Sequence, residues 1–183
     1  CLAHDGTNLY VGGQFTNAGG VAVMNVAKWD GTSWTNLGAG IGDRWANVYS
    51  LNFIGNSLYA CGMFDYGSGR ARVAMWNGSS WVGVGGGVGG DAYSMSQDGT
   101  NLYVGGNFTS PGNRVAKWNG TAWAGLGSGL DSVAWALAHD GTTLYAGGQF
   151  SSAGGVSASR MAMWTPTAAT NPGVAPTAGS FTG

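Results

Sequence analysis

Side chains of the kinds that perform catalysis are few and scattered in this sequence. The two histidines, His4 and His139, stand at the same position of a repeated segment, which is typical of a structural role. The eight aspartates lie mainly in turns, without a calcium-binding Asp-x-Asp-x-Asp-Gly loop, a glycosidase-type carboxylate pair or an ordered Ser/His/Asp set. The diglycines end strands and match neither a P-loop nor a dinucleotide-binding pattern. We therefore expect a non-catalytic protein with no cofactor and no metal site.

Composition excludes several further classes of protein. The 183 residues include 36 Gly and no Glu, only 8% are charged, and the net charge is −1. Because Glu and Lys are common on helix surfaces, a helical protein is disfavoured, and the weak charge predicts no binding to nucleic acid. No stretch reaches the roughly 20 apolar residues of a membrane helix, so we expect no membrane insertion. The Gly/Ser/Thr/Asn/Trp-rich composition indicates an extracellular or cell-surface location.

One repeat of 42 to 49 residues occurs four times along the chain. The segment Asp5–Tyr10 recurs at residues 54–59, 98–103 and 140–145. Each copy continues into a short glycine-containing run that ends in Phe, such as Val11–Phe15, and then into tryptophans. Three copies carry a tryptophan pair, namely Trp29/Trp34, Trp76/Trp81 and Trp118/Trp123, whereas Trp164 has no second tryptophan.

Each repeat is predicted to form four short antiparallel strands, named a to d in chain order. Strand a is exemplified by residues 48–52, strand b by the Leu-Tyr-Val-Gly-Gly segment and strand c by residues 26–29, and strand d begins at the second tryptophan. Asp-Gly and Asn-Gly dipeptides between neighbouring strands favour tight hairpin turns. One four-stranded sheet per repeat predicts an all-β fold of β-propeller blades. The blades span approximately 1–43, 44–88, 89–130 and 131–164.

The repeat also resembles a known family. Leu-Tyr-Val-Gly-Gly followed by Val-Ala-Lys-Trp-Asp-Gly-Thr-Ser-Trp-x-x-Leu-Gly is similar to a kelch-type repeat, as found in secreted bacterial kelch-like arrays and fungal cortical cell-polarity marker proteins. The resemblance covers about nine-tenths of the chain and implies a kelch-type β-propeller with four repeats. Two departures are Cys61, which replaces the first glycine of the second diglycine, and the missing second tryptophan of the fourth repeat.

Two packing expectations follow from the blade register. Isolated blades cannot bury both faces, so we expect the strand-c tryptophans to lie mostly buried between blades. Cys1 is expected opposite Gly12 and Cys61 opposite Ser50, on different sheets. A disulfide requires Cβ atoms within about 4.5 Å, so we expect no bond between the two cysteines.

The end of the sequence lacks a recognisable strand d for the fourth repeat. Residues 165–183 have the composition of an extended Pro/Ala/Thr/Gly-rich tail or linker. Only residues 179–182 resemble a strand, with Phe181 as the apolar anchor. We expect the tail to reach a neighbouring subunit or domain, so that the chain self-associates through it and does not close as a monomer. The alternatives are a longer propeller, an assembly of several copies and a closed four-bladed ring.

Variation in length is confined to the b–c and d–a connections, which lie at one edge of each sheet, here called the loop edge. Functional residues concentrate on variable loops that a rigid scaffold carries. All five arginines map to this edge, together with two aromatic residues. The candidate partner-binding residues are Arg44, Trp45, Tyr66, Arg70, Arg72, Arg114 and Arg160. Alternatively, the arginines at the start of strand c bond neighbouring loop carbonyls.

These features favour a non-catalytic extracellular module that binds a protein, or takes part in architectural assembly, through the loop edge. Arg, Trp and Tyr are enriched at protein interfaces, which supports this interpretation. One alternative is a lectin-type propeller that binds glycans, which would require the same Trp, Arg or Asn site between successive blades. A second alternative is a non-catalytic part of a larger secreted enzyme.

Overall fold

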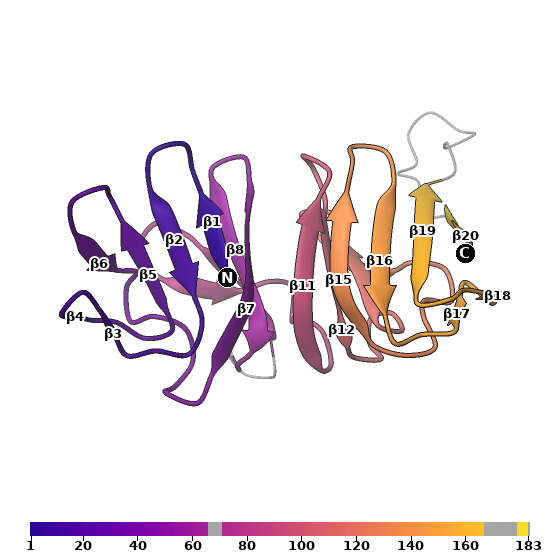
Figure 1. Ribbon diagram of the computed structural model, residues 1–183, viewed down its shortest axis with the longest axis horizontal. Coiled ribbons are helices and arrows are strands. Elements are labelled where there is room, and N and C mark those ends of the chain that lie inside the picture. Colours follow the sequence, from indigo (N-terminus) through magenta and orange to yellow (C-terminus); the bar gives the residue numbers. More distant parts are fainter. Residues whose placement is uncertain (66–70, 167–178, 183) are drawn as a thin grey trace. The chain divides into compact units, whose positions relative to one another are not determined.

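The computed structural model describes residues 1–65, 71–166 and 179–182 (Figure 1). Every regular element in these ranges is a β-strand, which confirms the all-β prediction. The strands form four antiparallel sheets of four strands each and two small two-stranded hairpins. Within the described ranges there is no helix with the length and apolar character needed to cross a membrane.

The four sheets take their strands in the order a to d. The first sheet consists of β1 (Leu2–His4), β2 (Leu9–Gly12), β5 (Val26–Trp29) and β6 (Trp34–Asn36). The second consists of β7 (Asn47–Ile54), β8 (Ser57–Met63), β9 (Val73–Trp76) and β10 (Trp81–Gly83). The third consists of β11 (Asp91–Gln97), β12 (Leu102–Asn107), β13 (Val115–Trp118) and β14 (Trp123–Gly125). The fourth consists of β15 (Ala134–His139), β16 (Leu144–Gly148), β19 (Met161–Pro166) and β20 (Gly179–Thr182).

The two hairpins lie in the b–c connections of the first and fourth sheets. They are β3 (Asn17–Ala18) with β4 (Val21–Ala22), and β17 (Ser152–Ala153) with β18 (Val156–Ser157). Each turns on a Gly-Gly pair with positive φ, for example 56° at Gly19 and 89° at Gly20. Two consecutive residues of positive φ form a tight hairpin, which explains why these longer connections fold into strands.

Among the described a–b and c–d turns, all except the Gly55-Asn56 turn of the second sheet share one construction. In the first a–b turn Gly6 has a φ of 97°, and the Asp5 carboxylate accepts a hydrogen bond of 2.7 Å from the backbone N–H of Asn8. The turn after β5 repeats this arrangement with Asp30 and Gly31, whose φ is 95°. Glycine adopts such φ values without steric cost, so the Asp-Gly pairs specify the hairpins, as the sequence predicts.

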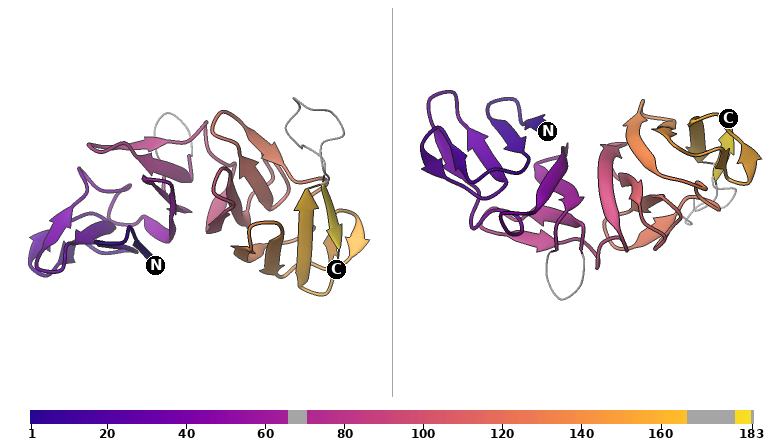
Figure 2. Two further views of the ribbon diagram at one scale, coloured as in Figure 1. Left: turned by 90° about the horizontal axis from the view of Figure 1, so that it is seen from above. Right: turned by 60° about the horizontal axis from the view of Figure 1, so that its bottom comes forward.

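The C-terminal tail supplies the strand that the fourth repeat lacks in the sequence. Gly179–Thr182 forms β20 and pairs with β19, so it takes the place of strand d in the fourth sheet (Figures 1 and 2). Phe181 lies opposite Trp164, the place that a second tryptophan takes in the other sheets. Strand c also extends to Pro166, beyond the predicted blade end. Of the predicted tail or linker at 165–183, residues 167–178 and 183 lie outside the described residues.

The chain divides into two compact bodies, Cys1–Tyr93 and Ser94–Gly183. The first body holds the first and second sheets, and its apolar core joins residues of both, including Val26, Val48 and Leu58. The second body holds the fourth sheet and most of the third, and its core includes Tyr103 and Leu144. Each body therefore buries apolar surface between two consecutive sheets.

The same packing joins consecutive sheets within each body: strand b of one sheet lies against strand a of the next, here called the b-on-a interface. In the first body β2 packs on β7, and a Cβ added at Gly12 would lie 2.6 Å from Cγ1 of Val48. In the second body β12 packs on β15, and a Cβ at Gly105 would lie 3.0 Å from Cγ of Leu137. The first glycine of the diglycine is thus needed for close approach of two sheets.

Burial of the strand-c tryptophans differs from the expectation. Trp164 is 1% exposed, whereas Trp29, Trp76 and Trp118 are only partly buried. In the fourth sheet the Trp164 ring lies opposite Phe181 of β20, and its centroid is also 6.2 Å from that of Tyr103 in the preceding sheet. Full burial of this position therefore depends on what covers each sheet and not on the repeat alone.

The predicted cysteine registers are confirmed. Cys1 exchanges two backbone hydrogen bonds with Gly12, and Cys61 pairs with Ser50. Both cysteines are free thiols in the structure, Cys1 exposed and Cys61 buried.

Candidate functional site

A residue with left-handed backbone precedes strand c in three sheets. Asn25, Arg114 and Arg160 have φ values of 63°, 63° and 65°. In each case the backbone N–H donates to the carbonyl of the phenylalanine that follows strand b, and the backbone carbonyl accepts from the second glycine of the diglycine. A positive φ is uncommon for residues other than glycine, and here these paired bonds hold it in place. The two ends of these three b–c connections are therefore hydrogen-bonded to each other.

The arginines at the loop edge have different environments. Arg114 donates from Nη1 to the carbonyl of Phe108 at 3.2 Å, which is the carbonyl-bonding role that the sequence left as an alternative. Arg72 lies between two carboxylates, with Nη1 3.6 Å from Asp65 and 3.8 Å from Asp91. Arg160 is exposed. Tyr66 and Arg70 lie outside the described residues.

The first body has a hollow of about 320 Å³ at the loop edge, called the first hollow. It is lined by the connection before β7 and by the b–c connection after β8, and it brings together two of the predicted residues, Trp45 and Arg72. The other side chains along it are those of Asp43, Ala46, Met63, Phe64 and Asp65. Nε of Arg72 is buried without a hydrogen-bond partner among the described residues.

Trp45 is the most exposed large apolar side chain of the described residues. It is 66% exposed, and Met63 beside the same hollow is 38% exposed. The backbone N–H of Trp45 donates to Oδ1 of Asp43 at 2.8 Å, which fixes the base of the Trp45 side chain. The guanidinium carbon of Arg44 lies 5.1 Å from the centroid of the Trp45 ring, within the range of a cation–π contact. The predicted pair Arg44 and Trp45 therefore forms one surface feature.

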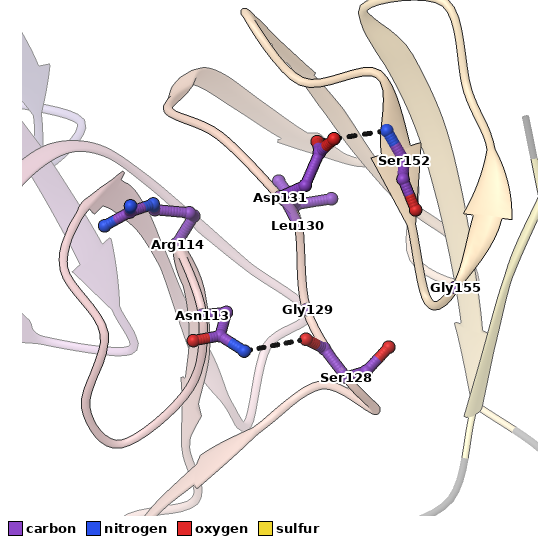
Figure 3. Close-up of a pocket in the computed structure, with 8 residues that line it drawn as sticks. All are labelled: Asn113, Arg114, Ser128, Gly129, Leu130, Asp131, Ser152 and Gly155. Carbon is purple, nitrogen blue, oxygen red and sulfur yellow. Dashed lines mark hydrogen bonds between the residues drawn. The ribbon is translucent and has the colours of Figure 1, made fainter.

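The second body has a hollow of about 350 Å³ at its loop edge, called the second hollow (Figure 3). It is lined by the b–c connection of the third sheet, the connection from β14 to β15, and the β17–β18 hairpin. Asn113 donates from Nδ2 to the Ser128 carbonyl at 3.0 Å, and the Asp131 carboxylate accepts from the backbone N–H of Ser152 at 3.0 Å. In Figure 3 the guanidinium of Arg114 extends away from Asp131.

The polar groups of the second hollow hold the loops to one another. The Asp131 carboxylate also accepts a hydrogen bond of 2.7 Å from the Ser151 hydroxyl. This bond and the backbone donors of Ser152 and Ser151 hold the pKa of Asp131 below its usual value. A carboxylate that is already bonded to three donors is a positioning group for the loops, and the hollow lacks the exposed aromatic surface of the first.

A third hollow, of about 480 Å³, lies between the first and second sheets of the first body, at the edge opposite the loop edge, where the a–b and c–d turns lie. His4 and Asp5 line it, but Nδ1 of His4 accepts from the Gly6 N–H at 3.0 Å and Asp5 holds the turn. His139 accepts from Gly141 in the same way at 2.9 Å. Both histidines therefore serve the turns, and no cluster of three or more potential metal ligands occurs within the described ranges.

Comparison with known proteins adds no identification. No protein-family model and no curated protein matches the chain. The function is therefore argued from the sheets and from the two loop-edge hollows.

Several residues at the loop edge were not singled out by the sequence. Asn25 is completely buried and donates from Nδ2 to the carbonyls of Ile41 and Asp43. Asn113 and Met63 line the hollows but carry no local signal, since neither type is unusual in a loop. Asn25 takes the position of the strand-c arginines in the first sheet, and the left-handed backbone that it shares with Arg114 and Arg160 was not predicted. The Asn-Ala-Gly-Gly-Val and Ser-Ala-Gly-Gly-Val segments do carry a hairpin signal that would have located the β3–β4 and β17–β18 hairpins.

Proposed function

We propose that the chain is an extracellular, kelch-like β-propeller module that binds a protein partner through the loop edge and catalyses no reaction. Four sheets with one strand order, joined by the same b-on-a interface in both bodies, support the propeller interpretation. The scarcity of charged residues and the Gly/Ser/Thr/Asn/Trp-rich composition support the location.

The exposed surface beside the first hollow carries the proposal. Trp45 exposes apolar area on a connection that is anchored by a hydrogen bond to Asp43, and Met63 exposes apolar area at the end of β8. The exposed Arg44 lies against the Trp45 ring, whereas the charge of Arg72 is paired with Asp65 and Asp91. Trp, Met and Arg are the side chains enriched in the centres of protein interfaces. A preorganised tryptophan loses little conformational freedom on binding, so its burial by a partner contributes directly to affinity.

The differences between the two hollows favour a protein over a repeated glycan ligand. A lectin with one site per blade requires the same side chains between successive sheets. Both hollows contain a strand-c arginine, but the first adds Trp45 and Met63, whereas the second adds Asn113 and Ser152 and has no aromatic side chain in its lining. The loop edge therefore presents one distinctive patch in place of a repeated site.

A different surface favours a glycan as the second candidate ligand. Tyr49 in β7 and Trp135 in β15 stand at β-bulges, where the register shifts between the flanking residues. They are 40% and 49% exposed. Bulges re-aim side chains, and aromatic rings in equivalent positions of two sheets suit stacking against sugar rings.

The test measures binding of secreted and surface proteins from the producing organism to the immobilised chain, followed by the affinity of the captured partner. Trp45→Ala is expected to raise the dissociation constant about 30-fold or more, as for an interface hot spot of about 2 kcal/mol. Thr32→Ala, a change at an exposed position of the opposite edge, is the matched control and should leave the affinity unchanged.

Two results would contradict the protein-binding proposal. One is an affinity of Trp45→Ala equal to that of the unmodified chain. The other is glycan-array binding that is lost on Tyr49→Ala and Trp135→Ala but kept in Trp45→Ala, which would establish the second candidate instead.

A further inference from the structure

One face of strands b and c is covered in both b-on-a interfaces. In the third sheet this face carries Tyr103, Gly105 and Val115, and β15 covers it. Tyr103 is 1% and Val115 0% exposed. In the first sheet the corresponding Val26 is 0% exposed under β7. Within each body the following sheet therefore buries this face.

The fourth sheet presents the same face without a cover. Gly147 takes the position of Gly105 and pairs with Met161, and Tyr145 takes that of Tyr103 and pairs with Met163. Met161 is 61% and Met163 39% exposed, and no described residue lies within 4 Å of a Cβ built at Gly147. We call Tyr145, Gly147, Met161 and Met163 the acceptor face (β16 and β19 in Figure 1).

The first sheet presents the complementary face without a cover. Leu2 in β1 takes the position of Leu51 in β7 and of Leu137 in β15. Leu51 is only 6% exposed and Leu137 packs against the core of the second body, whereas Leu2 is 64% exposed. Val11, opposite Leu2, is half-buried, although its counterpart Val104 is fully buried. We call Leu2, His4, Leu9 and Val11 the donor face.

We propose that the donor face of one copy of this chain docks on the acceptor face of a second copy, which repeats the b-on-a interface between molecules. The two faces are the counterparts of a contact that the chain already makes twice internally. Met161 and Met163 replace Val115 and Lys117 of the covered sheet, so the acceptor face is at least as apolar. Leu2 then lies over Gly147, as Leu137 lies over Gly105. Burial of Leu2 and Met161 removes two large apolar side chains from water, which drives the association.

The ring contacts of the internal interface predict a further intermolecular pair. Tyr103 stacks on His139 with ring centroids 5.2 Å apart and an interplanar angle of 15°. His4 is the counterpart of His139, and Tyr145 is the counterpart of Tyr103. In the docked pair His4 of one copy therefore stacks on Tyr145 of the other. The association is head-to-tail, because each copy contributes a different face.

Light scattering of the full chain at several concentrations tests this proposal. The unmodified chain is expected to show a mass of at least two chains, whereas Leu2→Asp and Met161→Asp should each raise the dissociation constant about tenfold or more, since each loses the burial of an apolar side chain. Val156→Asp is the matched control, because Val156 is 46% exposed but lies on the β17–β18 hairpin, outside both faces. Circular dichroism checks that each variant is folded.

A mixture of the two variants tests whether the contact is head-to-tail. Leu2→Asp retains an intact acceptor face and Met161→Asp an intact donor face, so a head-to-tail contact predicts a complex of one chain of each. If instead each face paired with the same face of a second copy, mixing the two variants would not produce this complex. A monomeric unmodified chain, including one in which its own two faces meet, or a mixture that does not associate, would overturn the proposal.

Discussion

At the scale of single residues, the two cysteines show how the same side chain acquires opposite chemistry from its surroundings. Cys1 lies exposed beside β2, and its thiol contacts the carbonyl of Val48 at 3.5 Å. Cys61 occupies the position of a diglycine residue in β8 and is completely buried. Burial removes the thiolate from water and raises the pKa of the Cys61 thiol well above its usual value.

Alkylation followed by mass measurement distinguishes the two thiols. With excess iodoacetamide at pH 8, Cys1 is expected to react rapidly, because it is exposed. Cys61 should react only when urea unfolds the chain, since the thiolate is the nucleophile and burial suppresses it. Cys61→Ser is the control that identifies the slow site. Equal rates of modification at both cysteines in the folded chain would contradict this assignment.

At the scale of elements, β20 completes the fourth sheet with a residue that the repeat does not predict. Phe181 is 6% exposed and replaces the second tryptophan opposite Trp164. Gly179 lies directly against the Trp164 ring, since a Cβ built there would approach Cε2 to 2.2 Å. The indole therefore occupies the space that any side chain at position 179 would need.

Substitution of Gly179 tests this arrangement. Gly179→Ala is expected to lower the free energy of unfolding by about 1–3 kcal/mol, the usual cost of overpacking. Ser180→Ala, a change at the exposed neighbouring residue of the same strand, is the matched control and should have little effect. Urea unfolding followed by tryptophan fluorescence gives both values. Equal stability of the two variants would show that β20 does not pack on Trp164.

At the scale of the whole molecule, aspartates in the a–b turns connect stability to pH. Backbone hydrogen bonds, from Asn8 and from Thr142 first, lower the pKa values of Asp5 and Asp140. For Asp98 desolvation raises the pKa, but the hydrogen bonds from Asn101 and its neighbours outweigh it and the net shift is downward. All three carboxylates therefore favour the folded chain most when they are ionised.

Acid should destabilise the chain through these turns. Since the folded pKa values lie below the unfolded value of about 3.9, their contribution is complete above that pH and is lost as the pH falls through the folded values. Urea unfolding between pH 7 and pH 2.5 should show constant stability down to about pH 5 and a decline below it.

A variant with asparagine at these turns provides the control for the acid effect. The change Asp5→Asn with Asp98→Asn and Asp140→Asn removes three titrating groups. Asn77 and Asn119 already accept the equivalent backbone bonds in c–d turns, so the variant should fold with a weaker pH dependence. An undiminished decline in the variant would show that other groups cause the acid sensitivity.

Local chemistry determined most of the strand pattern from the sequence alone. The turn glycines and the tryptophans act over a few residues, so strand c at Val26–Trp29 and strand d at Trp34 lie where the sequence predicts them. The same reasoning placed Trp45 and Arg72 on one edge, and the structure brings them to one hollow. The order of the strands in each sheet, and the edge at which each connection lies, follow from the hairpins between neighbouring strands, which are local in the sequence.

Only the tertiary structure decided the features that depend on distant segments. The pairing of Gly179–Thr182 with β19 spans a long connection, and Phe181 opposite Trp164 replaces the residue that marks strand d elsewhere. The salt bridges of Arg72 and the carbonyl bond of Arg114 depend on loop conformations that composition does not specify. Equivalent residues also differ in burial, Leu51 covered and Leu2 open, because burial depends on the neighbouring sheet and not on the residue itself.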